Sequence, residues 1–138
     1  MPYLALKLST ATTADEARQL ALTLTDLTVE LLHKRRELTA VTIDTIAPGH
    51  WFIGGEAAVV PAPQAFHLEI TVTEGTNSAE EKARFIAAIF GAMADFLGRL
   101  DPASYVVVHD VAGEAWGYGG RSQASRRAGT AAMAAVSA

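Results

Sequence analysis

The sequence repeats itself at a fixed offset of 65 residues, and an internal repeat of this kind constrains the fold more than any other feature. The segments Thr13–Glu16 and Ser78–Glu81 both have the pattern of a capping box, in which a hydroxyl and a glutamate satisfy backbone amides at the start of a helix. The pairs Gly54-Gly55 and Gly119-Gly120 keep the same offset. The sequence therefore predicts two copies of one folding unit.

Each half passes from the periodicity of a strand to that of a helix and back to a strand. Apolar residues first alternate with other residues, which is typical of a half-buried strand, and then recur at three- and four-residue steps, which is typical of a helix lying on a sheet. A β-branched run follows in both halves and predicts a second strand. The first strands lie at 3–8 and 67–72, the helices at 17–31 and 86–97, and the second strands at 40–43 and 105–108.

The repeated unit is therefore β-α-β with a terminal glycine hairpin, and the right-handed crossover makes its two strands parallel with the helix on one face. Two such units, about 2–57 and 65–121, predict a single α/β domain (α+β in the wider sense) with a four-stranded sheet and two helices on one face. Residues 122–138 are predicted to be a C-terminal tail. Because the other face of the sheet is left bare, we expect a homo-oligomer.

Composition limits the classes of function. The chain is 50% hydrophobic and carries a formal charge of −4, so we expect one globular domain that binds neither nucleic acid nor an anionic membrane surface. It has no cysteine, and its four histidines show no H-x-x-x-H spacing, so we expect no metal and no cofactor. No basic leader and no apolar run of eighteen residues is present, which predicts a cytoplasmic protein without a membrane span.

Pro2 is the residue that could provide the most unusual chemistry. Removal of Met1 would expose a secondary amine, and a free α-amino group has a pKa of about 7.7–8.0. Apolar surroundings destabilise the ammonium form, lower the pKa and leave a neutral amine that can act as a base. If Met1 is retained, the Pro2 nitrogen is an amide without basicity.

With Pro2 at the head of its first strand, the sequence resembles the tautomerase superfamily, which is built on β-α-β units with a catalytic amino-terminal proline. The segment Pro48–Glu56 is similar to the hairpin of 4-oxalocrotonate tautomerase, and Ala115–Arg121 is similar to an aromatic stretch of malonate semialdehyde decarboxylase. The doubled unit resembles fused members such as that decarboxylase and cis-3-chloroacrylic acid dehalogenase. The resemblance covers about residues 2–121 and implies a homotrimer acting on a small molecule without a cofactor.

The resemblance also implies roles for individual residues. Pro2 falls on the catalytic proline, which serves as a general base in tautomerases and as a cation in the dehalogenase and the decarboxylase. Trp51 falls on the aromatic residue that lines the tautomerase pocket, and Trp116 and Tyr118 fall on pocket aromatics of the decarboxylase. The alternative is that these aromatic residues pack a subunit interface beside their glycine hairpins.

Family members that act on carboxylates carry arginines after the first strand of a unit and near the start of the second, where this chain has none. Thr73 and Thr76 are therefore expected to hydrogen-bond the substrate. Lys7, Arg121 or a basic residue of the segment Lys34–Arg36 would have to supply charge, reaching in from a neighbouring subunit. The alternative for each of these charges is a solvated surface position.

Three functions follow in order of preference. The first is a cofactor-independent tautomerase in which Pro2 transfers protons on a small 2-oxo or enol compound. The second keeps the pocket but uses a protonated Pro2 for decarboxylation of a 3-oxo acid, or for hydration or dehalogenation of an unsaturated acid. The third is a trimeric binding scaffold without catalysis.

Overall fold

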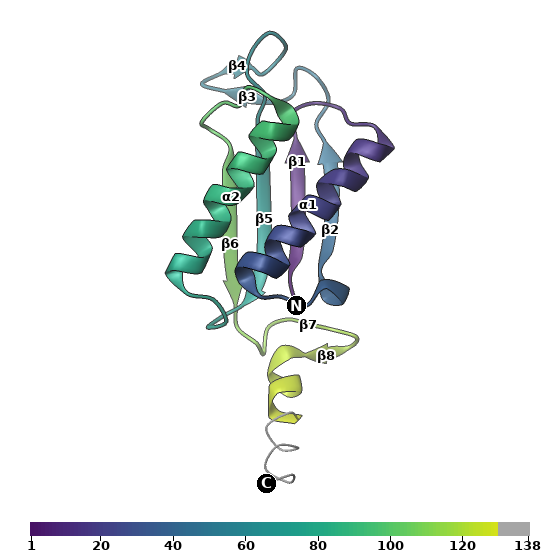
Figure 1. Cartoon of the computed structure of the whole chain (residues 1–138), viewed down its shortest axis with the longest axis vertical. Helices are drawn as coiled ribbons and strands as arrows, with labels where there is room; N and C mark the ends of the chain where they lie inside the picture. Colours follow the sequence, from purple (N-terminus) through teal and green to yellow (C-terminus); the bar gives the residue numbers. More distant parts are fainter. Residues whose placement is uncertain (130–138) are drawn as a thin grey trace.

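The computed structural model describes residues 1–129 and contains a four-stranded sheet of order β2-β1-β5-β6 (Figure 1). Within each half the two strands are parallel, and the halves join through the antiparallel pair β1 and β5. The strands are β1 (Tyr3–Leu8), β2 (Ala40–Thr45), β5 (Phe66–Thr73) and β6 (Tyr105–Val111). The predicted tandem β-α-β fold is confirmed.

One helix connects the two strands of each half, α1 (Ala14–Leu32) and α2 (Ala79–Leu97). Both helices begin at the predicted capping boxes: the Thr13 and Ser78 hydroxyls each accept a hydrogen bond from the third amide of their helix. The first helix is capped at its C-terminus by His33, which has a left-handed conformation (φ 58°). The short 3₁₀ helix η1 (Arg36–Leu38) then leads into β2.

Each half closes with a two-stranded hairpin, and the two hairpins lie at opposite ends of the sheet (Figure 1). The first is formed by β3 (Phe52–Ile53) and β4 (Glu56–Ala57), the second by β7 (Gly117–Tyr118) and β8 (Arg121–Ser122). Both turns consist of two glycines with positive φ, the conformation that a tight hairpin turn requires and that glycine adopts without steric cost. The N-terminus lies at the same end as the β7–β8 hairpin (Figure 1).

Both helices cover one face of the sheet, and the core lies between them and the strands (Figure 1). Alternate residues of β1 and β5 are buried there, as the period of two predicts. The fully or almost fully buried residues of this core are Leu4, Leu6, Leu8, Leu20, Leu24, Leu32, Phe66, Leu68, Ile70, Val72, Phe85, Ile89 and Met93.

The opposite face of the sheet, which no helix covers, carries charged side chains. Lys7 and Glu69 are exposed on it, and Glu69 lies between two imidazoles: 3.8 Å separates its Oε1 from His67 Nδ1 and 3.6 Å its Oε2 from His109 Nε2. Tyr105 is 59% exposed on the same face. Any partner that covers this face would therefore have to accommodate polar groups as well as apolar ones.

The chain continues in regular structure beyond the second hairpin. Ser122 ends β8, and residues 123–129 form a helix, so the predicted tail begins with ordered structure. The remainder of that tail, residues 130–138, lies outside the described residues. No helix in residues 1–129 is both long and apolar enough to cross a membrane.

We predict that Leu24→Ala lowers the free energy of unfolding by about 2–5 kcal/mol, because Leu24 is fully buried between α1 and the sheet and its truncation leaves a cavity. Leu22→Ala is the matched control on the same helix, since Leu22 is 54% exposed, and it should change this free energy by no more than about 0.5 kcal/mol. Urea denaturation at one fixed protein concentration measures both. Equal effects of the two substitutions would contradict the described packing of α1.

Candidate functional site

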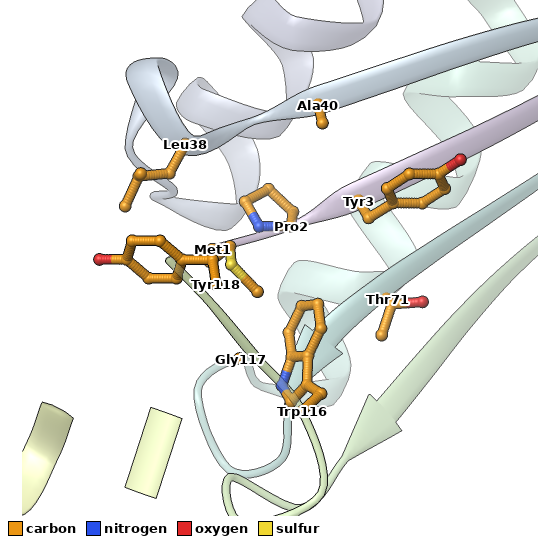
Figure 2. A pocket seen from close by; sticks show the side chains of 9 residues that line it. All are labelled: Met1, Pro2, Tyr3, Leu38, Ala40, Thr71, Trp116, Gly117 and Tyr118. Atoms are coloured by element: carbon orange, nitrogen blue, oxygen red, sulfur yellow. The ribbon is translucent and has the colours of Figure 1, made fainter. Parts of the chain in front are cut away.

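A pocket of about 410 Å³ lies at the end of the sheet where the chain begins (Figure 2). Its walls come from both halves of the chain, because the second hairpin closes over the start of the first strand. It is lined by Met1, Pro2, Tyr3, Leu38, Ala40, Thr71, Trp116, Gly117 and Tyr118.

Pro2 is buried at the inner wall, directly before β1. Its carbonyl oxygen accepts a hydrogen bond from the amide of Ala40 (3.3 Å), which continues the β1–β2 ladder by one residue. A proline is tolerated at this position because the ladder requires only its carbonyl group. Strand pairing thus fixes the position of Pro2 without using its nitrogen.

The aromatic wall is held by side-chain contacts of the second half. The indole Nε1 of Trp116 donates a hydrogen bond to Thr73 Oγ1 (3.1 Å), and Thr73 is buried at the end of β5. The guanidinium of Arg126 lies 3.8 Å from the centre of the Tyr118 ring and donates a hydrogen bond to the Tyr118 carbonyl (2.8 Å). Helix 123–129 therefore helps to fix the pocket through a cation–π contact.

Gly117 lets the two strands of this hairpin approach each other closely. A Cβ atom placed on Gly117 would lie 1.9 Å from the carbonyl oxygen of Arg121, a distance that no side chain can occupy. Only glycine fits between Trp116 and Tyr118 without moving the backbone of β8. The position of both aromatic side chains therefore depends on this glycine.

Positive charge surrounds the amino terminus at this pocket. Burial lowers the pKa of the Met1 amino group below its ordinary value, and the charges of Lys34 and Arg35 lower this pKa further. Burial also lowers the pKa of Lys34, whose Nζ donates a hydrogen bond to Thr76 Oγ1 (2.9 Å). Both cations come from the segment after α1 of the same chain, whereas the sequence predicted them from a neighbouring subunit.

The structure brings together only part of the predicted site. Pro2, Trp116 and Tyr118 line one pocket, and Thr73 supports it through the indole of Trp116. Thr76 is placed beside Lys34, outside the lining.

Two predicted residues lie apart from Pro2. The guanidinium of Arg121 points to Ser125, with Nη2 3.3 Å from Ser125 Oγ, and Arg121 lines a separate hollow on the hairpin. Trp51 lies beside the first hairpin, at the opposite end of the sheet, where it lines a different pocket. Trp51 and Arg121 therefore do not contribute to the Pro2 pocket within one chain.

The sequence did not predict the lining residues Tyr3, Leu38, Ala40 and Thr71. Tyr3 and Thr71 are directly paired across β1 and β5, so they share one face of the sheet. This pairing could have been found only by knowing the register of the two halves. Within residues 1–129 no group of three or more His, Asp or Glu side chains is placed to hold a metal ion.

Comparison with known proteins identifies the family. The sequence model of the Tautomerase family, described as tautomerase enzyme, matches residues 2–59 and 67–126, one match for each repeat. The chain belongs to the tautomerase family. It is similar to the probable tautomerase K2 of Dickeya dadantii (strain 3937), with 33% identity over 60 residues that cover 44% of this chain and 90% of that protein. Family membership indicates an enzyme of the isomerase type.

Solved structures share the fold of the whole duplicated unit at low sequence identity. Pt0534 inactivated by 2-oxo-3-pentynoate superposes with a TM-score of 0.79 at 18% identity, covering 90% of this chain and 98% of that one. A fused 4-OT that forms a symmetric trimer superposes with a TM-score of 0.78 at 19% identity, again covering 90% and 98%. Both comparisons extend over both repeats, so they support the duplicated fold.

We predict that Gly117→Ala displaces the aromatic wall of the Pro2 pocket, because the added methyl group overlaps the Arg121 carbonyl. The indole N–H signal of Trp116 in a nitrogen-15 NMR spectrum should shift or broaden, and the melting temperature should fall. The control is Gly91→Ala in α2, where nothing lies within 4 Å of the added Cβ and where alanine favours the helix. An unchanged Trp116 signal in Gly117→Ala would contradict the described hairpin.

Proposed function

We propose that this protein is a cofactor-independent tautomerase in which Pro2, freed by removal of Met1, moves a proton between oxygen and carbon of a small enol or 2-oxo compound. The single observation that carries the proposal is the buried Pro2 at the wall of an apolar pocket in a chain of the tautomerase family. A pocket of about 410 Å³ is suited to a small molecule.

The reaction requires only one titrating group. In the direction from enol to ketone, the neutral Pro2 amine accepts the proton of the enol hydroxyl and becomes an ammonium. The ammonium then delivers a proton to the carbon of the former double bond, so the carbonyl forms and the amine is neutral again. A base of this kind works best when its pKa lies near the working pH.

The electrostatics of the pocket support a neutral proline over a protonated one. In the described chain, burial and the charges of Lys34 and Arg35 lower the pKa of the amino group at Met1. After removal of Met1, the Pro2 amine would lie beside the same cations, and its ammonium form would be disfavoured for the same reasons. This favours proton transfer by a base over the alternatives of decarboxylation, hydration or dehalogenation, which need a protonated Pro2.

The lining points to a planar substrate with at most one negative group. Trp116 and Tyr118 offer flat aromatic surfaces in the Pro2 pocket, and Leu38 adds an apolar side chain (Figure 2). Lys34 and Arg35 lie close enough to the amino terminus to affect its pKa and are the cations that replace the absent arginines. An enol of a small 2-oxo acid or of its ester satisfies both conditions.

We further propose that the chain assembles as a homotrimer. A structural neighbour of the same duplicated fold, a fused 4-OT, is a symmetric trimer. The uncovered sheet face and the exposed Tyr105 are consistent with burial against further copies of the chain.

We predict that a variant with one extra residue between Met1 and Pro2 loses turnover of phenylenolpyruvate by at least about 100-fold, because its Pro2 nitrogen is an amide and cannot act as a base. Pro2→Ala should show a smaller loss, because removal of Met1 before alanine still exposes an amine, a primary one in place of the secondary amine of proline. Ultraviolet assay of ketonisation measures the rate, and intact mass establishes which proteins have lost Met1.

Pro63→Ala, in the connector between the two halves, is the matched control and should keep full activity. Circular dichroism verifies that all variants are folded. Full turnover by the extended variant would contradict proline catalysis. A correctly processed protein that is inactive on enols of 2-oxo acids and of their esters would instead support the trimeric binding scaffold.

We predict that Lys34→Gln shifts the acidic limb of the pH profile of kcat/KM to higher pH. Activity needs the neutral amine, so it rises as pH increases through the pKa of Pro2 and levels off above it. Removing the Lys34 charge stabilises the ammonium, raises this pKa and delays the rise. Lys34→Arg keeps the charge and should keep the profile, and an identical profile for Lys34→Gln would contradict the electrostatic role of Lys34.

A further inference from the structure

A second pocket lies at the opposite end of the sheet, beside the β3–β4 hairpin. Its volume, about 410 Å³, equals that of the Pro2 pocket. It is lined by Lys7, Ile46, His50, Trp51, Phe52, His67 and Glu69. The function proposed above uses none of these residues.

Strand register shows that the two pockets are equivalent positions of the internal repeat. Tyr3 pairs with Ala40 at the start of the first parallel pair, as His67 pairs with Tyr105 at the start of the second. Across the antiparallel pair β1 and β5, Tyr3 pairs with Thr71, and His67 pairs with Lys7. Because His67 is the counterpart of Tyr3, Lys7 is the counterpart of Thr71. Each pocket therefore lies at the start of one half's first strand.

Backbone hydrogen bonds at the two hairpins repeat at the same offset of 65 residues. The amide of Ala58 donates to the Trp51 carbonyl (2.9 Å), and the amide of Gln123 donates to the Trp116 carbonyl (3.0 Å). Trp51 thus holds the place in the second pocket that Trp116 holds in the first. The chain contains only these two tryptophans, one in each pocket.

The second pocket has no amine at the position of Pro2. The residue before His67 is Phe66, the counterpart of Pro2, and its backbone nitrogen donates a hydrogen bond to Ser104 Oγ (3.3 Å). A peptide nitrogen inside the chain has no basicity at any pH in the physiological range. The proline chemistry of the first pocket therefore has no equivalent here.

Hydrogen-bond donors in the second pocket have no partner among the described residues, whereas the indole donor of the first pocket is already bonded. The indole of Trp116 is bonded to Thr73, whereas within residues 1–129 the indole of Trp51 has no hydrogen-bond partner. Lys7 and the His50 side chain likewise have no hydrogen bond or ion pair in the described part of the chain. These three side chains offer an ammonium, an imidazole and an indole N–H to a ligand.

No acidic group forms an ion pair with Lys7 in the described part of the chain, although Glu69 lines the same pocket. Glu69 is flanked by His67 and His109, at 3.8 and 3.6 Å, and forms no ion pair with Lys7 among the described residues. Asp44 is paired with Lys7 in the β1–β2 register but is likewise not within ion-pair distance of it in this part of the chain. The Lys7 ammonium is therefore the cation available for binding.

We propose that the second pocket binds a small planar carboxylate and leaves it chemically unchanged. The flat part of the ligand stacks on Trp51, and its carboxylate accepts charge-assisted hydrogen bonds from Lys7. The repeat thus supplies one chain with two related pockets, a reactive one at Pro2 and a binding one at Trp51. This inference does not depend on the catalytic role of Pro2.

The two tryptophans allow each pocket to be observed separately. Titration of nitrogen-15-labelled protein with benzoate is followed through the two indole N–H signals, which Trp51→Phe and Trp116→Phe assign. We expect a saturable shift of the Trp51 signal. Lys7→Gln should weaken this binding by roughly tenfold or more, because a hydrogen bond to a charged group is lost.

Three controls separate charge recognition from loss of structure. Lys7→Arg keeps the cation and should bind benzoate with an affinity within a few-fold of the original, while Lys82→Gln, which removes a lysine of α2 paired with Asp110, should leave it unchanged. Benzamide, which is planar but uncharged, should bind at least about tenfold more weakly. A Trp51 signal that does not respond to benzoate, or that responds equally in Lys7→Gln or to benzamide, would overturn the proposal.

Discussion

The antiparallel pairing of β1 with β5 is the interaction on which the rest of the structure depends. It joins two β-α-β units so that the end of one unit lies at the beginning of the other. The hairpin of the second half consequently closes over Pro2 at the start of the first half (Figure 1). Neither half alone contains both the proline and its aromatic wall, so the Pro2 pocket exists only in the paired arrangement.

The same pairing produces a second pocket, and the two pockets have diverged in chemistry on one scaffold. Only the first half begins at a position where removal of one residue yields an amine. The first pocket surrounds that position with neutral side chains, and the charges of Lys34 and Arg35 lower the pKa of the amino group at Met1. The second places Lys7 and His50 in the pocket itself. A duplicated fold can therefore keep its backbone geometry in both halves while only one of them has a proline nitrogen that loss of Met1 would turn into an amine.

The repeat, the capping boxes and the glycine pairs predict the helices, the strands and both hairpins, because these features depend on local periodicity and turn chemistry. Pro2, Trp116 and Tyr118 were predicted together, and the structure places them in one pocket. Trp51 was predicted with them but lies at the other end of the sheet. Its place depends on the direction in which the two units pair, and periodicity within a unit carries no information about that direction.

The sequence also did not show from where the positive charge near the amino terminus comes. Helix α1 runs back along β1, so the residues that follow it return to the end of the sheet where the chain starts (Figure 1). Lys34 therefore reaches the neighbourhood of the amino terminus within its own chain. The sequence shows the cations but not the path of the helix over the sheet, which decides where they lie.

Catalysis by a proline base depends most directly on the protonation state of Pro2. Nitrogen-15 NMR titration of the Pro2 amine, in protein whose intact mass shows that Met1 has been removed, measures its pKa without reference to any substrate. A pKa below the ordinary α-amino value of about 7.7–8.0 is the result that burial and the nearby cations predict. A pKa above that range would mean a protonated proline at neutral pH and would contradict its role as a base.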